Sequence, residues 1–290
     1  MSSIRPRRSC LYMPGANAKA LEKARTLPAD ALLFDLEDAV APEAKADARD
    51  AVIAALAGGG YGKRELVIRV NALSTAWGRD DVRAAAKAGP DGVLFPKIDS
   101  AADIEAAEAL LREAGAPDAT AMWAMIETPK AILNIAEIAR AAERSRLSVF
   151  VMGTNDLAKD MRATQTPDRA PFLAALSLTV TAARAYGVTP IDGVYNDIAD
   201  DEGFAAICRH GLSLGFDGKT LIHPSQVEPC NAIFAPTADE VAWSRTVIAA
   251  FAAPENAGKG VLKVEGRMTE LLHLEQARRT VAIAEAIAAQ

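Results

Sequence analysis

The sequence predicts an α/β fold, a (β/α)8 barrel with a C-terminal helical lid segment. Short, almost wholly apolar runs alternate with helical patterns from the first strand to about residue 255, and this alternation favours parallel strand pairing. About eight strand–helix units can be counted, a number typical of a closed barrel. Polar residues follow these runs, as expected where a parallel strand leaves a core that is buried on both faces.

The expected elements follow one another in a regular order. Strands are expected at residues 9–13, 31–36, 65–70 and 92–95, in the runs beginning at 121 and 147, and at 189–194 and 216–221. Helices are expected at residues 18–26, 42–57, 80–87, 101–113, 130–142, 171–186 and 201–211. A doubly wound sheet would show the same alternation, so the barrel prediction depends on the number of units. The sequence contains no Gly-x-Gly-x-x-Gly after a strand and no P-loop, which argues against nucleotide-binding folds.

The C-terminal tail lies outside this repeat. We expect a catalytic barrel domain over residues 1–253 and a linker with a helical lid extension over residues 254–290. Residues 253–260 are rich in Pro, Gly, Ala and Asn, 261–266 form a short strand or turn, and 271–289 form a helix. This tail packs either on its own barrel or on that of a neighbouring subunit.

The composition limits the class of protein. Half of the 290 residues are hydrophobic but only 5% are aromatic, so the core is aliphatic and rich in alanine. A net charge of −6 with no basic run argues against nucleic-acid binding. Cys10, Cys208 and Cys230 form no CxxC pattern and predict reduced, buried thiols. The polar start and the lack of an 18-residue apolar stretch predict a cytoplasmic protein without a signal peptide or membrane span.

Two carboxylates end the two central apolar runs, Glu127 after the first and Asp156 after the second. Consecutive parallel strands would place both at the same edge of the sheet, several ångströms apart. Two oxygen ligands there, completed by water and substrate, suit a hard divalent cation. The alternative is that Glu127 and Asp156 only cap the helices after their strands.

Other polar side chains are expected at this edge, because barrel enzymes place their active sites where the strands end. Arg69 follows a Leu-Val-Ile run and suits bidentate binding of a carboxylate, or else pairs with the acidic cluster of Asp35, Glu37 and Asp38. That cluster could also hold metal-bound waters. Lys97 either adds positive charge near a developing oxyanion or forms a salt bridge at the barrel mouth.

The remaining polar strand ends are Arg8, Pro14, Asn71, and Asp192 with Tyr195-Asn196-Asp197. His210 is expected as a helix cap or surface residue, and His223 is expected to order the loop after the last strand. No Ser/His/Asp or Cys/His arrangement suggests nucleophilic catalysis.

Several segments, in this order, match a known family. They are Arg8-Ser9-Cys10-Leu11-Tyr12-Met13-Pro14-Gly15, Asp35-Leu36-Glu37-Asp38-Ala39-Val40, Arg69-Val70-Asn71, Pro96-Lys97, Ile126-Glu127-Thr128, Gly153-Thr154-Asn155-Asp156-Leu157 and Gly215-Phe216-Asp217-Gly218-Lys219-Thr220-Leu221-Ile222-His223-Pro224. With them the sequence resembles the citrate lyase β-subunit-like (CitE-like) branch of the HpcH/HpaI aldolase superfamily, which includes malyl-CoA and citramalyl-CoA lyases. The motifs cover nearly the whole chain, and together they are highly specific.

The resemblance implies a TIM barrel with Mg2+, or Mn2+, on Glu127 and Asp156. It implies that Arg69 binds the substrate carboxylate, with Glu127 and Lys97 also contacting substrate and the Glu37–Asp38 pair in the catalytic set. Coenzyme A is part of the substrate, and the segment with Arg8, Asn17 and Lys19 is implied to lie near its phosphates or adenine.

The implied reaction is a C–C lyase cleavage of a 3-hydroxyacyl-CoA such as malyl-CoA, which gives acetyl-CoA or propionyl-CoA and a 2-oxo acid. The alternatives are hydrolysis of a malyl-CoA-type thioester, a citrate lyase β subunit acting on a citryl thioester, and a non-catalytic barrel that binds metal and acyl-CoA.

The C-terminal segment departs from the family. Lyase members carry a Gly-x-Met-x-Asp segment whose Asp reaches a neighbouring subunit's site as an acid/base group. Here Gly266-Arg267-Met268-Thr269-Glu270 places Glu270 in the Asp position. Because small displacements are costly in catalysis, its role as a catalytic residue competes with that of a surface glutamate. A role in trans would require an oligomer, and the family suggests a homotrimer or homohexamer.

Overall fold

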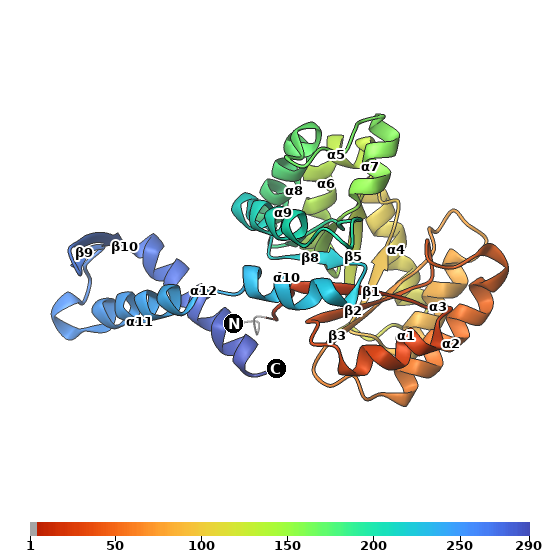
Figure 1. Ribbon diagram of the computed structural model, residues 1–290, viewed down its shortest axis with the longest axis horizontal. Coiled ribbons are helices and arrows are strands. Elements are labelled where there is room, and N and C mark those ends of the chain that lie inside the picture. Colours follow the sequence, from red (N-terminus) through yellow and green to blue (C-terminus); the bar gives the residue numbers. More distant parts are fainter. Residues whose placement is uncertain (1–4) are drawn as a thin grey trace. The chain divides into compact units, whose positions relative to one another are not determined.

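The computed structural model describes residues 5–290, and its larger unit, Arg7–Phe234, contains a closed barrel of eight parallel strands (Figure 1). Each strand pairs with the next in sequence, and β8 pairs with β1. The strands are β1 (Ser9–Pro14), β2 (Ala31–Asp35), β3 (Glu65–Arg69), β4 (Gly92–Phe95), β5 (Ala121–Ile126), β6 (Leu147–Met152), β7 (Thr189–Asp192) and β8 (Gly218–Leu221). The predicted (β/α)8 architecture is therefore confirmed.

Helices cover the outside of the barrel. They are α1 (Ala18–Lys23), α2 (Lys45–Gly58), α3 (Gly78–Ala88), α4 (Ala101–Glu113), α5 (Pro129–Leu133), α6 (Ile135–Arg140), α7 (Thr154–Met161), α8 (Leu173–Ala185), α9 (Asp201–Leu214) and α10 (Val227–Phe234).

Two helices differ from the expectation. The single helix expected at 130–142 is split into α5 and α6 at Asn134, whose side-chain amide donates to the carbonyl oxygen of Asp99 at 2.9 Å. Helix α7 was not predicted. It begins directly after Gly153, so Asp156 lies in the first turn of a helix and not at the tip of strand β6.

Successive residues of each strand face the barrel interior and the surrounding helices in turn. Both environments are apolar, so the apolar runs are nearly continuous. On β2, Leu33 belongs to the cluster inside the barrel, while Leu32 and Phe34 belong to the layer between strands and helices. The inner cluster also contains the fully buried Trp123 of β5. Because both faces of the sheet are dry, each strand stays apolar until its carboxyl end.

The second unit comprises Ala235–Gln290 with the described residues before Arg7. It contains α11 (Ala238–Ala252), an antiparallel hairpin of β9 (Val261–Val264) and β10 (Arg267–Glu270), and α12 (Leu271–Ala288). Helix α11 packs against α12, so this unit begins after Phe234, whereas the sequence placed the boundary after residue 253. Glu265 and Gly266 have positive φ angles of 46° and 84°, as a tight hairpin turn requires.

Two further expectations concern the whole described chain. Cys10, Cys208 and Cys230 are buried and free, as predicted. Among the described helices, none has both the length and the apolar character that a membrane crossing needs.

Candidate active site

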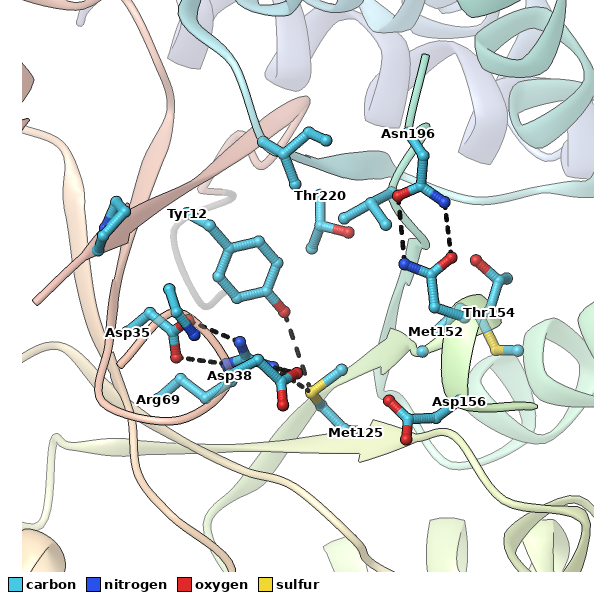
Figure 2. Close-up of a pocket in the computed structure, with 16 residues that line it drawn as sticks. Tyr12, Asp35, Asp38, Arg69, Met125, Met152, Thr154, Asp156, Asn196 and Thr220 are labelled. Atoms are coloured by element: carbon cyan, nitrogen blue, oxygen red, sulfur yellow. Dashed lines mark hydrogen bonds and ion pairs between the residues drawn. The ribbon is translucent and has the colours of Figure 1, made fainter. Parts of the chain in front are cut away.

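The carboxyl ends of the strands surround a cavity of about 340 Å³ (Figure 2). Its walls come from the ends of β1, β2, β3, β5, β6, β7 and β8 and from the residues that follow them. The lining side chains include Tyr12, Asp35, Asp38, Arg69, Met125, Met152, Asp156, Asn196 and Thr220. This is the face at which barrel enzymes place their active sites.

Glu127 and Asp156 are brought together through Lys97. Glu127 follows β5, is 1% exposed, and accepts a hydrogen bond from the backbone N–H of Lys97 at 2.7 Å. The Lys97 ammonium lies 3.3 Å from the same Glu127 oxygen and donates to Asp156 at 2.7 Å. Lys97 has a φ of 56°, in the left-handed region that non-glycine residues rarely adopt. The salt bridge at the barrel mouth, one of the two alternatives for Lys97, is present.

Among Lys97, Glu127 and Asp156, burial and neighbouring charge have opposite effects on the pKa values of Lys97 and Glu127. Burial raises the pKa of the Glu127 carboxyl, and the adjacent Lys97 charge only partly offsets that effect. For Lys97, burial alone lowers the pKa, but the hydrogen bond to Asp156 and the charge of Glu127 outweigh it, so its pKa is raised. Lys97 therefore stays a cation held between two carboxyl groups.

Gly153 makes room for Glu127. A Cβ atom at position 153 would lie 2.4 Å from the Glu127 Cβ and 2.9 Å from Glu127 Oε2, closer than real contacts allow. Only glycine lets the end of β6 approach the carboxylate so closely.

The donor chemistry of this pair fits a hard divalent cation. Glu127 and Asp156 already share one cation, the Lys97 ammonium. Within residues 5–290 no group of three or more His, Cys, Asp or Glu side chains is arranged around a common metal position. A metal at this pair would therefore take its other ligands from water and substrate.

Arg69 is already surrounded by carboxyl groups. Its Nε and Nη2 each donate to Asp35 at 2.7 Å, and its guanidinium lies 4.7 Å from the centre of the Tyr12 ring. Its Nη1 donates to Asp38 at 3.1 Å and lies 2.8 Å from Glu37 Oε2. The ion pair with the acidic cluster, the alternative weighed for Arg69, is thus formed in the structure.

Glu37 is the most perturbed carboxyl of this cluster. Burial raises its pKa from the ordinary 4.5 to about 8, and the Arg69 charge offsets only part of the effect. Its Oε2 is buried and makes no hydrogen bond with any described residue despite its proximity to Arg69. Near neutral pH Glu37 is therefore largely protonated. Lys45, which the sequence analysis missed, secures this loop by donating to the carbonyl oxygens of Leu36 and Glu37 at 2.9 and 2.7 Å.

Two residues expected at this edge lie elsewhere. Arg8 precedes the first residue of β1, so about 20 Å of strand separates it from the mouth at Pro14. It forms a bidentate ion pair with Asp30 at 2.7 and 2.9 Å, at the amino ends of the strands. Asp192 ends β7, but its partner Arg169 and its neighbour Gly211 show that it faces the helices and not the barrel interior.

Asn17, Lys19 and His223 lie in the positions that the sequence predicted for them, whereas His210 differs. Asn17 caps α1 by accepting from the Ala20 N–H at 3.1 Å, and Lys19 lies exposed in the same turn, both after the carboxyl end of β1. His223 accepts from the Ser225 N–H at 3.2 Å and so orders its loop. His210 is not merely a cap or a surface residue, because its Nδ1 accepts from Arg169 at 3.2 Å.

Glu270 ends β10 in the second unit. Its backbone N–H donates to His273 Nδ1 at 3.0 Å at the start of α12, and its side chain is exposed. This position agrees with a helix-start glutamate and leaves the role in trans as a proposal.

Sequence reasoning missed Tyr12, Met125 and Thr220 as lining residues. All three are inward-facing strand residues, and the alternation of each strand could have identified them once its first inward residue was known. Figure 2 shows the hydroxyl of Tyr12 directed toward the Met125 sulfur, at 3.9 Å.

Comparison with known proteins gives consistent matches, one to a family over residues 8–224 and others to relatives over 98% of the chain. A family described as HpcH/HpaI aldolase/citrate lyase matches residues 8–224. A (3S)-malyl-CoA thioesterase of Cereibacter sphaeroides (strain KD131 / KCTC 12085) is 50% identical over 284 residues, which cover 98% of this chain and 96% of the relative. An L-malyl-CoA/beta-methylmalyl-CoA lyase of Cereibacter sphaeroides (strain ATCC 17029 / ATH 2.4.9) is 34% identical, with 98% and 96% covered.

Among solved structures, the chain is similar to the crystal structure of protein CitE from Mycobacterium tuberculosis in complex with magnesium, acetoacetate and coenzyme A. The TM-score is 0.73 and the sequence identity 29%, over 96% of this chain and 97% of that chain.

Proposed function

Because the chain belongs to the HpcH/HpaI aldolase/citrate lyase family, we propose that it is a magnesium-dependent thioesterase that hydrolyses a malyl-CoA-type thioester. The observation that carries this proposal is the carboxylate pair Glu127 and Asp156, held around one cation beside a cavity at the barrel mouth. The 50% identity to a (3S)-malyl-CoA thioesterase supports hydrolysis over the lyase reaction expected from the sequence, since the lyase relative is 34% identical.

Glu127 and Asp156 are the residues that would hold Mg2+, or Mn2+. When bound, such an ion supplies Lewis-acid polarisation of a carbonyl oxygen and a template for the substrate. The Lys97 side chain is 40% exposed, so its ammonium can move into solvent when another cation takes the carboxylates. Lys97 then contributes positive charge at the rim of the cavity.

Arg69 binds the free carboxylate of the acyl group in this proposal. Asp35 holds Nε and Nη2, which leaves Nη1 for a third partner. Of the two carboxyl groups now beside Nη1, Glu37 is largely protonated near neutral pH and the Asp38 side chain is 68% exposed. An incoming carboxylate therefore competes mainly with the exposed Asp38 carboxylate.

Asp38 is the proposed base, because it is an exposed carboxylate in the cavity wall. It takes a proton from the water molecule whose oxygen attacks the thioester carbonyl carbon. As the tetrahedral intermediate collapses, the C–S bond breaks and Asp38 returns the proton to the coenzyme A sulfur. Asn17 and Lys19, exposed after β1, are the proposed contacts to the coenzyme A phosphates.

A second candidate is the C–C lyase reaction, with Glu270 acting in trans. The hairpin and the start of α12 expose Val261, Met268, Leu271 and Leu272, with Met268 74% exposed. Such a patch beside Glu270 favours contact with another subunit in a homotrimer or homohexamer. This exposed apolar patch is the observation that favours the lyase reaction as the second candidate function.

The test incubates the purified protein with malyl-CoA, citramalyl-CoA and citryl-CoA in H2 18O, with Mg2+ or with EDTA. Hydrolysis predicts free CoA and an intact hydroxy acid with one 18O atom in the released carboxylate, identified by mass spectrometry. Glu127→Gln should abolish this product, while Glu137→Gln, an exposed glutamate on α6, should retain it.

A 2-oxo acid and a shorter acyl-CoA as first products would instead establish the lyase. The reaction would then be lost in Glu270→Ala if that residue acts in trans. Turnover that persists in EDTA and in Glu127→Gln would refute both readings, and binding of malyl-CoA without turnover would support the non-catalytic barrel.

A further inference from the structure

Three inward-facing residues of alternate strands form the floor of the candidate active site. They are Tyr12 of β1, Arg69 of β3 and Met125 of β5, and all three line the cavity of about 340 Å³. In the layer beneath them, β3 and β5 supply Val67 and Trp123, which are fully buried. Because alternate strands fill a barrel interior layer by layer, the cavity ends at these three side chains.

The Tyr12 ring is held against the Arg69 guanidinium, whose carbon lies 4.7 Å from the ring centre. A cation over an aromatic face is attracted to it, so this contact orients the ring. Figure 2 shows the hydroxyl at its tip directed toward the Met125 sulfur. Burial raises the pKa of this hydroxyl, and the Arg69 charge offsets only part of the effect. Tyr12 therefore keeps its proton and is a hydrogen-bond donor.

The Tyr12 hydroxyl has a poor acceptor for that proton. The acceptor is the Met125 sulfur, at 3.9 Å, and a thioether sulfur accepts hydrogen bonds only weakly. Nη1 of Arg69 points at the same sulfur, at 3.8 Å. Two donors thus converge on one weak acceptor. Because a methionine side chain is unbranched and flexible, it can give way to a better one.

Arg69 alone offers little unbalanced charge to a substrate carboxylate. Asp35 accepts from its Nε and Nη2 at 2.7 Å each, and this ion pair compensates the guanidinium charge. A second carboxylate at Nη1 therefore depends on further donors at the same position. Hydrogen bonds to a charged acceptor are stronger than those between neutral groups, so the Tyr12 hydroxyl would gain by exchanging a sulfur for a carboxylate oxygen.

We propose that Tyr12 is a substrate-binding residue, whose hydroxyl binds the free carboxylate of the acyl group together with Nη1 of Arg69. One carboxylate oxygen accepts from Nη1 and the other from the Tyr12 hydroxyl, in the place now taken by the Met125 sulfur. This inference rests on the proposed role of Arg69 in carboxylate binding, but not on whether hydrolysis or C–C cleavage follows. Tyr12 then selects acyl groups that end in a carboxylate over neutral ones.

The test measures the binding of two acyl-CoA probes by isothermal titration calorimetry in EDTA. Succinyl-CoA ends in a carboxylate, and butyryl-CoA has a methyl group in its place. Wild type should bind succinyl-CoA more tightly. Tyr12→Phe keeps the ring over Arg69 and removes only the hydroxyl. It should weaken succinyl-CoA binding by about tenfold or more, the effect of one hydrogen bond to a charged group, and leave butyryl-CoA binding unchanged.

Tyr186→Phe is the matched control. The Tyr186 hydroxyl accepts from Arg140 after the end of α8, and this residue does not line the cavity. The control should bind both probes as wild type does. Urea unfolding should have the same midpoint in Tyr12→Phe and in wild type, because the lost hydroxyl contacts only a weak acceptor.

Kinetics with malyl-CoA and Mg2+ give a second readout. Tyr12→Phe should raise KM and change kcat little, because a carboxylate remote from the reacting carbon is bound equally in the ground state and the transition state. A lower kcat with unchanged succinyl-CoA binding would overturn the proposal and assign the hydroxyl to the developing oxyanion. Equal weakening of both probes would also overturn it, since the hydroxyl would then only support the cavity floor.

Failure of this inference can be told from failure of the proposed hydrolysis. If Tyr12→Phe binds succinyl-CoA as wild type does while malyl-CoA is still hydrolysed, only the role of Tyr12 is refuted. If malyl-CoA is not hydrolysed but Tyr12→Phe loses the preference for succinyl-CoA, the role of Tyr12 is supported and only hydrolysis is refuted. A wild type that binds both probes equally would overturn the carboxylate-binding roles of both Tyr12 and Arg69.

Discussion

Replacing Glu37 by glutamine should change how the stability of the protein depends on pH. Burial raises the Glu37 pKa from 4.5 to about 8, so between these values the folded state holds a proton that the unfolded state has lost. Unfolding then releases a proton, and the free energy of unfolding falls as pH rises through this window. A glutamine side chain at this position would be neutral at every pH, and the variant would show no such fall.

The magnitude follows from the two pKa values. The gap between 4.5 and about 8 corresponds to at most about 5 kcal/mol at 1.36 kcal/mol per pH unit. The Glu37 side chain is 13% exposed, so solvent reduces this, and we expect Glu37→Gln to gain about 2 to 5 kcal/mol over wild type between pH 4.5 and pH 8.5. Below pH 4.5 the two proteins should be nearly equal in stability.

The assay is urea unfolding in EDTA at several pH values across this window, monitored by circular dichroism. Glu43→Gln, at an exposed glutamate in the short 3-10 helix Pro42–Ala44 that follows the Glu37 loop, is the matched control. It should run parallel to wild type at all pH values. If Glu37→Gln is also parallel to wild type, Glu37 is ionised in the folded protein and competes with the substrate carboxylate for Arg69, contrary to our reasoning.

Three further changes test the site's construction. Lys97→Met should lower stability in EDTA by only about 1 kcal/mol, because the ion pairs of a partly exposed lysine contribute little. It should also enlarge the Mg2+-induced rise in Tm. An unchanged rise would show that Lys97 and the metal do not compete. Gly153→Ala should cost about 1–3 kcal/mol in urea unfolding through its clash with Glu127, and Gly260→Ala, in open space, should be tolerated; equal stability would contradict the close approach. Asp192→Asn should lower stability by about 3–5 kcal/mol because two buried cations lose their carboxylate, and a loss below about 1 kcal/mol would mean that the cluster is solvated.

Lys97 connects the structure to the proposed chemistry. Its ammonium keeps Glu127 and Asp156 close, and its exposure lets it move away from them. A carboxylate pair that is pre-assembled around an internal cation avoids the repulsion of two adjacent anions while no metal ion is bound, as the proposed function requires. Lys97 also has a left-handed backbone, a conformation that costs energy and persists where the surrounding structure requires it.

The barrel and the carboxylate pair could be predicted because both depend on local patterns. A strand buried on two faces must be apolar along its length, so the chain itself marks where each strand ends and where a charge such as Glu127 emerges. Helix α7 was missed because the apolar run of β6 passes into it after a single glycine, and nothing in periodicity separates a strand tip from a first helical turn.

The partners of each charge, in contrast, were decided by the tertiary structure. Arg69 faces Asp35, Glu37 and Asp38, Lys97 bridges two carboxylates, and Asp192 turns outward to Arg169. A periodic pattern states that a residue ends a strand, but not which face its side chain takes or which distant charge lies within a few ångströms. Ion pairing falls off steeply with distance and burial, and both of these exist only once residues far apart in the chain are packed together.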